Sequence, residues 1–284
     1  RMVKLFAEHA YHLMPEERFY YGSPNWHAHA GNGLYTIGVL FPEFRESRRW
    51  RETAANRLYA ELESQVYPDG MQVELTSSYH QVTMGHLSAP LALAELNGLV
   101  LPEGYLPKLE RMDNANLYAA MPDGRLPALG DGGRTNVRRH LKEGAALFPD
   151  RPDFAWMATE GAEGTRPSGN SYAFSHSGYL VMRSGWDPGD LYALLDVGPS
   201  GLWHQHEDRL SFVAYAYGRQ HIVDSGSYSY DDSVWRKHVI STFAHNTVIV
   251  DGEGQHIRGT KETDEDYILS EPLAHIWISE TGFD

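Results

Sequence analysis

The sequence predicts an α+β protein in which helices fill the first half and antiparallel strands fill the second. Three observations support this order. Apolar residues recur at helical spacing in the first half, a stretch rich in Pro, Gly and polar residues follows, and short β-rich runs separated by Gly, Asp or Pro come last. We therefore expect a helical part over 1–150, a linker over 151–170 and an antiparallel sheet or sandwich over 171–284.

The clearest predicted helix covers residues 48–66. Trp50, Ala54 and Leu58 begin an apolar series that recurs every four residues, and such a series draws one stripe along a helix. Similar patterns, separated by turns that contain Gly or Pro, predict further helices. These helices cover residues 87–96, 105–119 and 136–148.

Short runs in the second half have the composition of β-strands. Each run is rich in β-branched or aromatic residues and is bounded by Gly, Asp or Pro. The runs cover residues 178–185, 191–198, 210–218, 220–226, 245–252 and 266–279. Their short spacing favours an antiparallel arrangement.

Composition excludes several classes of protein. The 24 Lys and Arg against 38 Asp and Glu give a net charge of −14, which argues against a nucleic-acid-binding protein. Because the chain has no Cys, disulfides and Cys-ligated zinc are excluded, and the 15 His are the main candidate ligands. No apolar stretch of about 18 residues is present, so we expect no membrane insertion. The sequence does not indicate an oligomeric state.

Three residues near the ends of predicted strands could bind a metal ion. They are His206, Asp224 and His245, and two imidazoles with one carboxylate suit zinc. Their spacing matches no local metal motif. From the residues alone, an alternative is that His245 caps a strand and Asp224 forms a turn with Gly226.

A second group of candidates lies in the helical half. Asn25, Trp26 and His27 follow one another in a predicted loop, and Tyr79 and His80 form a second pair. A Tyr hydroxyl beside a His can transfer a proton if its neighbours favour the anion of a group whose pKa is ordinarily about 10. The alternative is that the aromatic residues line the core or a groove and that the histidines are incidental.

Seven motifs occur in the same order as in a known enzyme family. They are NW at 25–26, DGMQVELTSSYH at 69–80, LPALGDGG at 126–133, SGYLVMRSGWD at 177–187, HQHEDRLSF at 204–212, GRQHIVDSGSYSY at 218–230 and AHNTVIVDG at 244–252. In these motifs the chain resembles the heparinase II/III-like polysaccharide lyases, which include heparinase III and the oligoalginate lyases. The resemblance implies an incomplete (α/α) toroid followed by an antiparallel β-sandwich, as the central part of a longer enzyme.

The same resemblance implies a reaction. Such lyases cleave uronic-acid glycans, including heparin, heparan sulfate and alginate, by β-elimination. Removal of the C5 proton places negative charge beside a carboxylate, so donors must neutralise that carboxylate. The resemblance assigns this task to Asn25, the general acid to Tyr79, and proton transfer or carboxylate contact to His204.

Further roles follow from the resemblance. His206, Asp224 and His245 match the family's zinc ligands, in a structural role that fixes the strands presenting His204. His80 is a second candidate for contact with the substrate carboxylate and for lowering the pKa of Tyr79. The candidate substrate contacts are Trp26, His27, Arg134 and Arg236.

The segment 203–212 offers a structural test of this assignment. His204 is expected to face the sugar and His206 the metal, with Asp208 supporting the turn. Residues two apart in an extended strand face the same side. The backbone around Gln205 must therefore be irregular.

Two other functions remain open from sequence. A glycoside hydrolase would need two carboxyl groups about 5–9.5 Å apart, for which Asp69, Glu74 and Asp131 are candidates. The chain could also be a non-catalytic carbohydrate-binding protein. Under the lyase interpretation the partner is an anionic polysaccharide or oligosaccharide and the protein is periplasmic or secreted, although the first residues lack the layout of a signal peptide.

Overall fold

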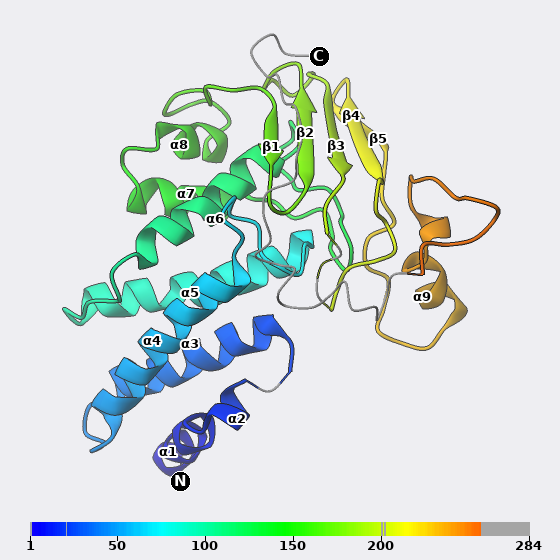
Figure 1. The fold of residues 1–284 in the computed structure, drawn as a ribbon. Coiled ribbons are helices and arrows are strands. Elements are labelled where there is room, and N and C mark those ends of the chain that lie inside the picture. Colours follow the sequence, from blue (N-terminus) through cyan, green and yellow to red (C-terminus); the bar gives the residue numbers. More distant parts are fainter. Residues whose placement is uncertain (1, 21, 200, 202, 257–284) are drawn as a thin grey trace. The chain divides into compact units, whose positions relative to one another are not determined.

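Helices are followed by an antiparallel sheet, which confirms the predicted α+β fold class (Figure 1). The computed structural model describes residues 2–20, 22–199, 201 and 203–256. Contacts divide the chain into an N-terminal unit, Arg1–Val66 with Gln81–Leu109, and a C-terminal unit, Tyr67–His80 with Glu110–Asp284. No helix in the described part of the chain combines the length and the apolar character needed to cross a membrane.

The N-terminal unit is built around the helix pair α3 and α4. Its helices are α1 (Met2–Leu13), α2 (Glu16–Phe19), α3 (Pro24–Leu40) and α4 (Ser47–Gln65), with parts of α5 (Ser77–Leu96) and α6 (Tyr105–Ala119). A methyl group on Gly31 would lie 2.7 Å from the Leu58 side chain, and one on Gly38 would lie 2.8 Å from the Ser47 carbonyl oxygen. Glycine at these two positions therefore permits the close packing of α3 on α4.

The C-terminal unit contains a five-stranded antiparallel sheet in the order β1-β2-β3-β4-β5. Its elements are α7 (Arg138–Leu147), α8 (Pro152–Ala158), β1 (Tyr172–Phe174), β2 (Tyr179–Arg183), β3 (Tyr192–Asp196), β4 (Phe212–Ala216), β5 (Arg219–Ile222), α9 (Val234–Val239) and the 3₁₀ helix η1 (Thr242–Ala244). Among the described residues this one sheet represents the partial sandwich. The predicted linker contains α8, and the division at 150 and 170 stays a prediction.

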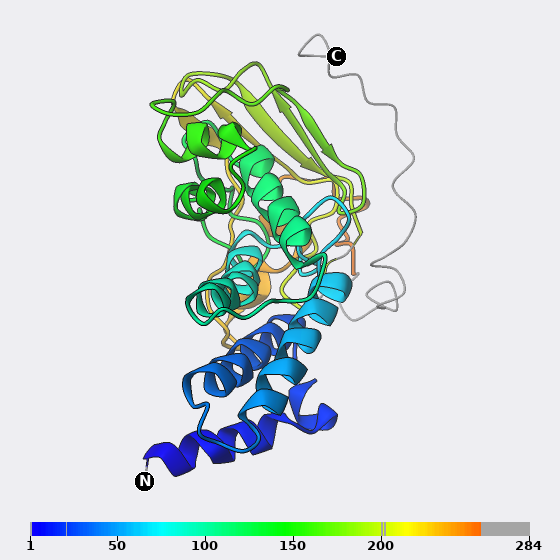
Figure 2. The same ribbon diagram turned by 90° about the vertical axis from the view of Figure 1, so that its left-hand side faces the viewer.

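Alternation along β2 and β3 builds the core of the C-terminal unit. Tyr179 and Val181 on β2 and Leu194 on β3 are buried, while the residues between them are partly exposed, as expected for a sheet with one covered face. Side chains from α6, α7 and α8 belong to the same core, and Figure 2 shows these helices beside the sheet.

The predicted strand over 245–252 is wrong. Asp251 and Gly252 have positive φ angles of 55° and 78°, which form a tight turn, and only an isolated bridge joins Val250 to Glu253. The carbonyl of Asn246 instead accepts a hydrogen bond from the Phe212 amide, at 3.3 Å. No neighbouring strand among the described residues completes a ladder along this segment. The predicted run 266–279 lies outside the described residues.

A buried acid on α6 leads to a first prediction. Burial, and then the negative charge of Glu143, raise the pKa of Asp113 to about 8. The folded chain therefore holds a proton that the unfolded chain releases between about pH 4 and pH 8, so stability falls as pH rises through this window. Asp113→Asn is expected to remove this dependence and to stabilise the fold by on the order of 2 kcal/mol at about pH 8.

Thermal melts of both chains across that pH range check the expectation. Asp187→Asn, at an exposed carboxylate paired with Arg166, is the control and should melt as the wild type does. Parallel pH profiles for the wild type and Asp113→Asn would show that Asp113 is ionised in the folded chain.

Candidate functional site

Two histidines and one aspartate meet in the C-terminal unit. His206, Asp224 and His245 each offer one ligand atom, and these atoms all lie within 4.8 Å of one another. The residues come from the loop before β4, from the segment after β5 and from the residue after η1. Nδ1 of His245 lies 2.7 Å from Oδ2 of Asp224, and both side chains are buried. The fold thus brings together the three predicted metal ligands.

The chemistry of this group fits a metal ion. Nδ1 of His206 and Nε2 of His245 are buried and have no hydrogen-bond partner within the described residues, an arrangement that costs free energy. The buried acids Asp196 and Asp208 interact electrostatically with Asp224, and burial raises the pKa of both. A cation would accept the two nitrogen lone pairs and offset the buried carboxylates.

Asp224 also makes the turn that its sequence position suggests. Its Oδ1 atom accepts a hydrogen bond from the Gly226 amide at 3.0 Å. The turn and the metal-ligand interpretations are compatible, because the two carboxylate oxygens have different partners.

Asp131 lies at the centre of a polar cluster next to this group. Its carboxylate oxygens lie within hydrogen-bond distance of His204 Nδ1 at 3.2 Å and of His206 Nε2 at 3.0 Å. They also accept hydrogen bonds from two nitrogens of Arg236. Burial alone would raise the pKa of Asp131, but the hydrogen bonds from these three side chains outweigh it and hold the pKa well below its usual range. Asp131 is therefore ionised in the folded chain.

Tyr79 and His204 bring together two side chains of this cluster that can transfer protons. Their rings stack with centroids 3.6 Å apart and planes 7° apart. The hydroxyl of Tyr79 lies 2.8 Å from that of Tyr230, which in turn lies 3.4 Å from Nδ1 of His204. Tyr79 and His204 are only partly buried, so a hydroxyl and an imidazole are available together for proton transfer.

The backbone around Gln205 is irregular, as the separate roles predicted for His204 and His206 require. No strand includes this segment, and Trp203 and Leu210 have positive φ angles of 66° and 61°. His204 can therefore stack on Tyr79 while His206 belongs to the metal-binding group. Both rings nevertheless contact one carboxylate, that of Asp131.

Comparison with known proteins identifies the family. The heparinase II/III N-terminus matches residues 1–156, and the heparinase II/III-like C-terminal region matches residues 166–273. The first match alone covers more than half of the chain. The chain belongs to the heparinase II/III family. The resemblance seen in the sequence motifs is confirmed.

Curated relatives of this chain include two that are named heparin-sulfate lyase. The chain is 31% identical over 234 residues to that of Pedobacter heparinus, covering 79% of this chain and 36% of the relative. It is 29% identical over 260 residues to that of Bacteroides stercoris, covering 87% of this chain and 38% of the relative. The chain thus spans less than two fifths of the length of these relatives.

Solved structures in the family share this fold. A heparinase III gene product matches with a TM-score of 0.78 and 30% identity, over 88% of this chain and 40% of that one. A heparan sulfate lyase from Pedobacter heparinus matches with a TM-score of 0.72 and 30% identity, over 84% of this chain and 39% of that one. These matches support the predicted succession of a toroid part and a β part.

The family motifs did not identify two residues of the site. From sequence, Asp131 is a candidate only for a glycosidase carboxylate, and Tyr230 has no assigned role. Both lie inside motifs shared with the heparinase II/III family, LPALGDGG and GRQHIVDSGSYSY. Their position in these motifs was the one sequence signal for a role in the site. The residues that Asp131 and Tyr230 contact lie in segments distant in sequence.

The structure does not place His80 where it could meet a substrate. His80 is 1% exposed. Its Nδ1 accepts from the Gln72 amide at 3.3 Å, and its Nε2 lies 3.3 Å from the Met112 carbonyl oxygen, to which it can only donate. Both ring nitrogens are therefore used inside the C-terminal unit, which leaves none for a sugar carboxylate.

His80 should instead make the fold sensitive to acid. Burial lowers its pKa to about 4. The unfolded chain binds a proton below about pH 6.5 that the folded chain refuses, so stability falls as pH falls from about 6.5 to about 4. His80→Gln is expected to flatten this part of the pH profile. The substitution should remove a loss of folding free energy of on the order of 2 kcal/mol at about pH 4.

Urea unfolding at several pH values measures this profile. His238→Gln, at an exposed histidine, is the matched control and should keep the wild-type slope. An unchanged slope in His80→Gln would assign the acid sensitivity to other groups.

The predicted loop that carries Asn25, Trp26 and His27 is the first turn of α3, where Pro24 starts the helix. The side chain of Asn25 is buried and donates to the Ser23 hydroxyl at 3.0 Å. Trp26 is 55% exposed. Nδ1 of His27 lies 3.4 Å from a Glu61 carboxylate oxygen, so one ring nitrogen already has a partner within the N-terminal unit.

The two predicted substrate-binding arginines differ in their surroundings. Arg134 is partly exposed and pairs with Asp123, so its guanidinium stays at the surface. Arg236 is 8% exposed and both its terminal nitrogens contact Asp131. Arg236 therefore belongs to the interior of the site and Arg134 does not.

The three carboxylates considered for a glycoside hydrolase are engaged elsewhere. Asp69 accepts from the amides of His176 and Ser177, each at 2.8 Å, and Asp131 is saturated as described. Glu74 is fully buried. Glu74 and Asp131 are buried and Oδ2 of the partly exposed Asp69 is held by backbone donors, so the three do not form the accessible carboxyl pair that a glycosidase requires.

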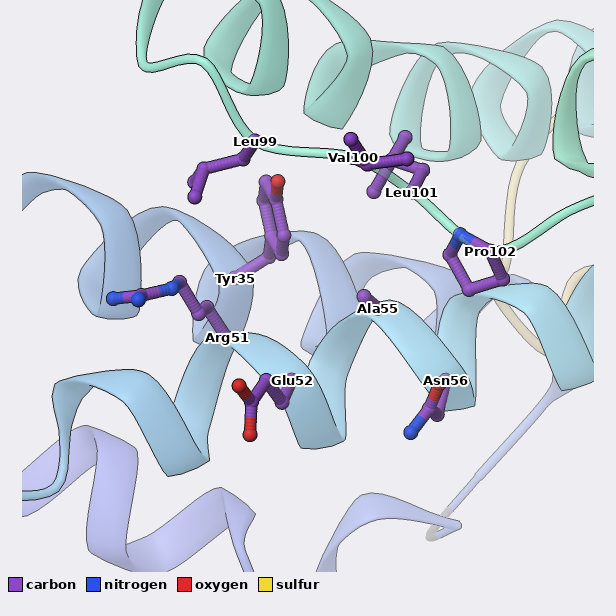
Figure 3. Close-up of a pocket in the computed structure, with 9 residues that line it drawn as sticks. All are labelled: Tyr35, Arg51, Glu52, Ala55, Asn56, Leu99, Val100, Leu101 and Pro102. Atoms are coloured by element: carbon purple, nitrogen blue, oxygen red, sulfur yellow. The ribbon is translucent and has the colours of Figure 1, made fainter.

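A separate cavity lies in the N-terminal unit (Figure 3). It has a volume of about 430 Å³ and is lined by Tyr35, Arg51, Glu52, Ala55, Asn56, Leu99, Val100, Leu101 and Pro102. Figure 3 shows Tyr35 directed from α3 toward the segment of Leu99 and Val100. None of the predicted site residues lines this cavity.

Proposed function

We propose that this chain carries the chemistry of a polysaccharide lyase that cleaves uronic-acid glycans by β-elimination, with heparin and heparan sulfate as the substrate class. The observation that carries the proposal is the stacked pair of Tyr79 and His204 in a chain of the heparinase II/III family. The curated relatives are named heparin-sulfate lyases. No relative on which the proposal rests is named for alginate.

The proposed reaction needs one base and one acid. A base removes the proton at C5, the electron pair of that bond forms the C4–C5 double bond, and the C4–O bond breaks. The leaving oxygen then takes a proton from the acid. Tyr79 is the proposed acid, and either its phenolate or Nε2 of His204 takes the C5 proton, with a contribution to the rate of about 10²–10⁴-fold.

Neutralisation of the substrate carboxylate is assigned by family resemblance. Asn25 is the proposed donor, because an amide NH₂ donates at any pH. Trp26 and His27 are proposed to contact sugar rings and Arg134 to contact an anionic group. Arg236 is left out of this set, since its guanidinium is held by Asp131.

We also propose that the metal is zinc and that its role is structural. Two imidazoles and one carboxylate, His206, Asp224 and His245, are a ligand set that zinc accepts and that calcium and magnesium do not favour. When bound, zinc would hold three separate chain segments together. His206 is two residues from His204, so this restraint would also fix the loop that presents the imidazole.

An absorbance assay tests the proposed function. The full chain is incubated with heparan sulfate, heparin, alginate and hyaluronan, and the ultraviolet absorbance of unsaturated uronate ends is followed. Heparan sulfate is expected to give rising absorbance. New reducing ends without absorbance would show a hydrolase and contradict the lyase proposal. Binding without products would indicate a carbohydrate-binding protein. Turnover of alginate alone would contradict the proposed substrate class.

A periplasmic or secreted location completes the proposal. The substrate is a long polyanion, which does not cross a bilayer unaided, so the enzyme must meet it outside the cytoplasm. Fractionation of the source cells with an antibody to the chain tests this, and recovery only with cytoplasmic markers would contradict it.

A further inference from the structure

Four donors converge on the Asp131 carboxylate. Oδ1 contacts Nε2 of His206 and one nitrogen of Arg236, and Oδ2 contacts Nδ1 of His204 at 3.2 Å and the other Arg236 nitrogen at 2.8 Å. A carboxylate has about four lone-pair positions, which a guanidinium and two ring nitrogens fill. With 1% of its side chain exposed, Asp131 has no capacity left for a substrate.

We propose that Asp131 is a positioning residue that fixes the ring tautomers of both His204 and His206, and thereby couples the acid–base side of the site to its metal side. The inference deepens the proposed lyase function and rests on it only for the task of His204. The tautomers themselves follow from the contacts.

The tautomer of each ring follows from what a carboxylate can do. An ionised carboxylate only accepts hydrogen bonds, so each ring nitrogen that contacts Asp131 must carry a proton. His204 therefore holds its proton on Nδ1, and a neutral ring then has its lone pair on Nε2. His206 holds its proton on Nε2 and has its lone pair on Nδ1, which is the nitrogen without a partner in the described part of the chain.

The two free lone pairs serve different tasks. Nε2 of His204 is left as the atom that can accept a proton, on a ring stacked against Tyr79. Nδ1 of His206 is left as the atom that can bind a metal ion beside Asp224 and His245. One carboxylate thus prepares a base and a ligand, as a carboxylate commonly does for a single metal-bound histidine.

Backbone contacts hold the Asp131 loop against the His204 loop. The amide of Asp131 donates to the carbonyl oxygen of His204 at 2.8 Å. A methyl group on Gly130, which has a φ of +52°, would lie 2.8 Å from that same carbonyl oxygen. Glycine at this position allows the close approach, so the carboxylate is placed by the loop and not only by its charged partners.

Arg236 neutralises the carboxylate without competing for the two rings. Its guanidinium takes one lone pair on each oxygen and leaves one on each for a histidine. A buried carboxylate with two neutral imidazoles would otherwise be an uncompensated charge.

The wild-type chain gives the first test. Nitrogen-15 NMR of the imidazole rings, with Zn²⁺ added, distinguishes a proton on Nδ1 from one on Nε2, and His204→Gln and His206→Gln assign the two signals. Nδ1–H is expected for His204 and Nε2–H for His206. The opposite tautomer at either ring would overturn the proposal, and the tautomers are read from the wild-type chain without any need for enzymatic activity.

Asp131→Asn gives the second test. An amide has one accepting oxygen and one donating nitrogen, so it cannot accept from both rings. At least one histidine is expected to change tautomer, and Zn²⁺ affinity, measured by competition with a chelator, is expected to fall by about 10–100-fold. Asp187→Asn is the control and should match the wild type. Unchanged tautomers and affinity in a folded Asp131→Asn chain would overturn the proposal.

A third measurement separates this inference from the proposed function. If heparan sulfate is a substrate, Asp131→Asn should lower kcat more than it changes KM, and Asp131→Glu, which restores a carboxylate, should recover part of kcat. A chain that shows the expected tautomers but cleaves no uronate glycan would refute the lyase function and leave the positioning role of Asp131 intact.

Discussion

Tyr79→Phe is expected to lower kcat for β-elimination on heparan sulfate by about 10²–10⁴-fold. The substitution removes one hydroxyl, which is the proposed donor to the leaving oxygen, and keeps the ring that stacks on His204 at a centroid distance of 3.6 Å. Binding of substrate should change little, because the ring and its surroundings remain. The measurement is the initial rate of absorbance increase at saturating substrate, together with KM.

Tyr217→Phe is the matched control for this experiment. Tyr217 is 82% exposed and lies at the turn between β4 and β5, so loss of its hydroxyl should leave kcat unchanged. The hydrogen bond between Tyr79 and Tyr230 adds a second comparison. If Tyr79→Phe retains wild-type turnover while Tyr230→Phe loses it, the proton donor is Tyr230 and the role of Tyr79 is wrong.

Local apolar periodicity predicted the helices whose own sequence carries the repeat. The helix expected over 48–66 is α4, at Ser47–Gln65, and the helix expected over 105–119 is α6, at Tyr105–Ala119. In both cases the signal lies within the element itself. The strands β2 and β3 were found from composition instead, since each run is rich in β-branched or aromatic residues and is bounded by Gly, Asp or Pro.

Elements that depend on distant partners were harder to predict. The run 245–252 has the composition of a strand, but a strand needs a neighbour, and the backbone there turns at Asp251 and Gly252. The loop predicted around Asn25 is helical because Pro24 can begin a helix, where its missing N–H costs nothing. Composition alone does not distinguish these outcomes.

The same limit applies to the site. The sequence selected His206, Asp224 and His245 by family resemblance, and the fold brings their ligand atoms within 4.8 Å. It did not indicate that Asp131 joins His204 to Arg236, because these residues are separated by 73 and 105 positions from Asp131. Long-range contacts of this kind are set by tertiary packing, which leaves no periodic trace in one sequence.

Removal of the metal is expected to destabilise the C-terminal unit strongly. Without an ion, two buried ring nitrogens lack partners within the described residues and buried carboxylates lie close together. A ligand that binds only the folded chain stabilises it by about 4 kcal/mol at a concentration near 1,000 times Kd. Treatment with a chelator should therefore lower Tm by several degrees, and Zn²⁺ should restore it.

Metal analysis and ligand variants identify the ion and its site. Elemental analysis of the purified chain is expected to find zinc, and His245→Ala should lose it, because His245 supplies a buried nitrogen to the group. His238→Ala, at an exposed histidine, should keep both the zinc and the wild-type Tm. Restoration of Tm by Ca²⁺ but not by Zn²⁺ would contradict the choice of metal, since calcium prefers a shell of oxygen ligands.

The same experiment separates a structural metal from a catalytic one. A structural zinc would restrain the loop that carries His204 and His206, so Tm and activity should fall together as metal is removed and recover together when it returns. If the metal were catalytic, its removal would abolish activity while Tm stayed close to that of the metal-loaded protein. Because the side chains of His206, Asp224 and His245 are almost fully buried, we expect the first pattern, with proton transfer by Tyr79 and His204 as the chemistry of the site.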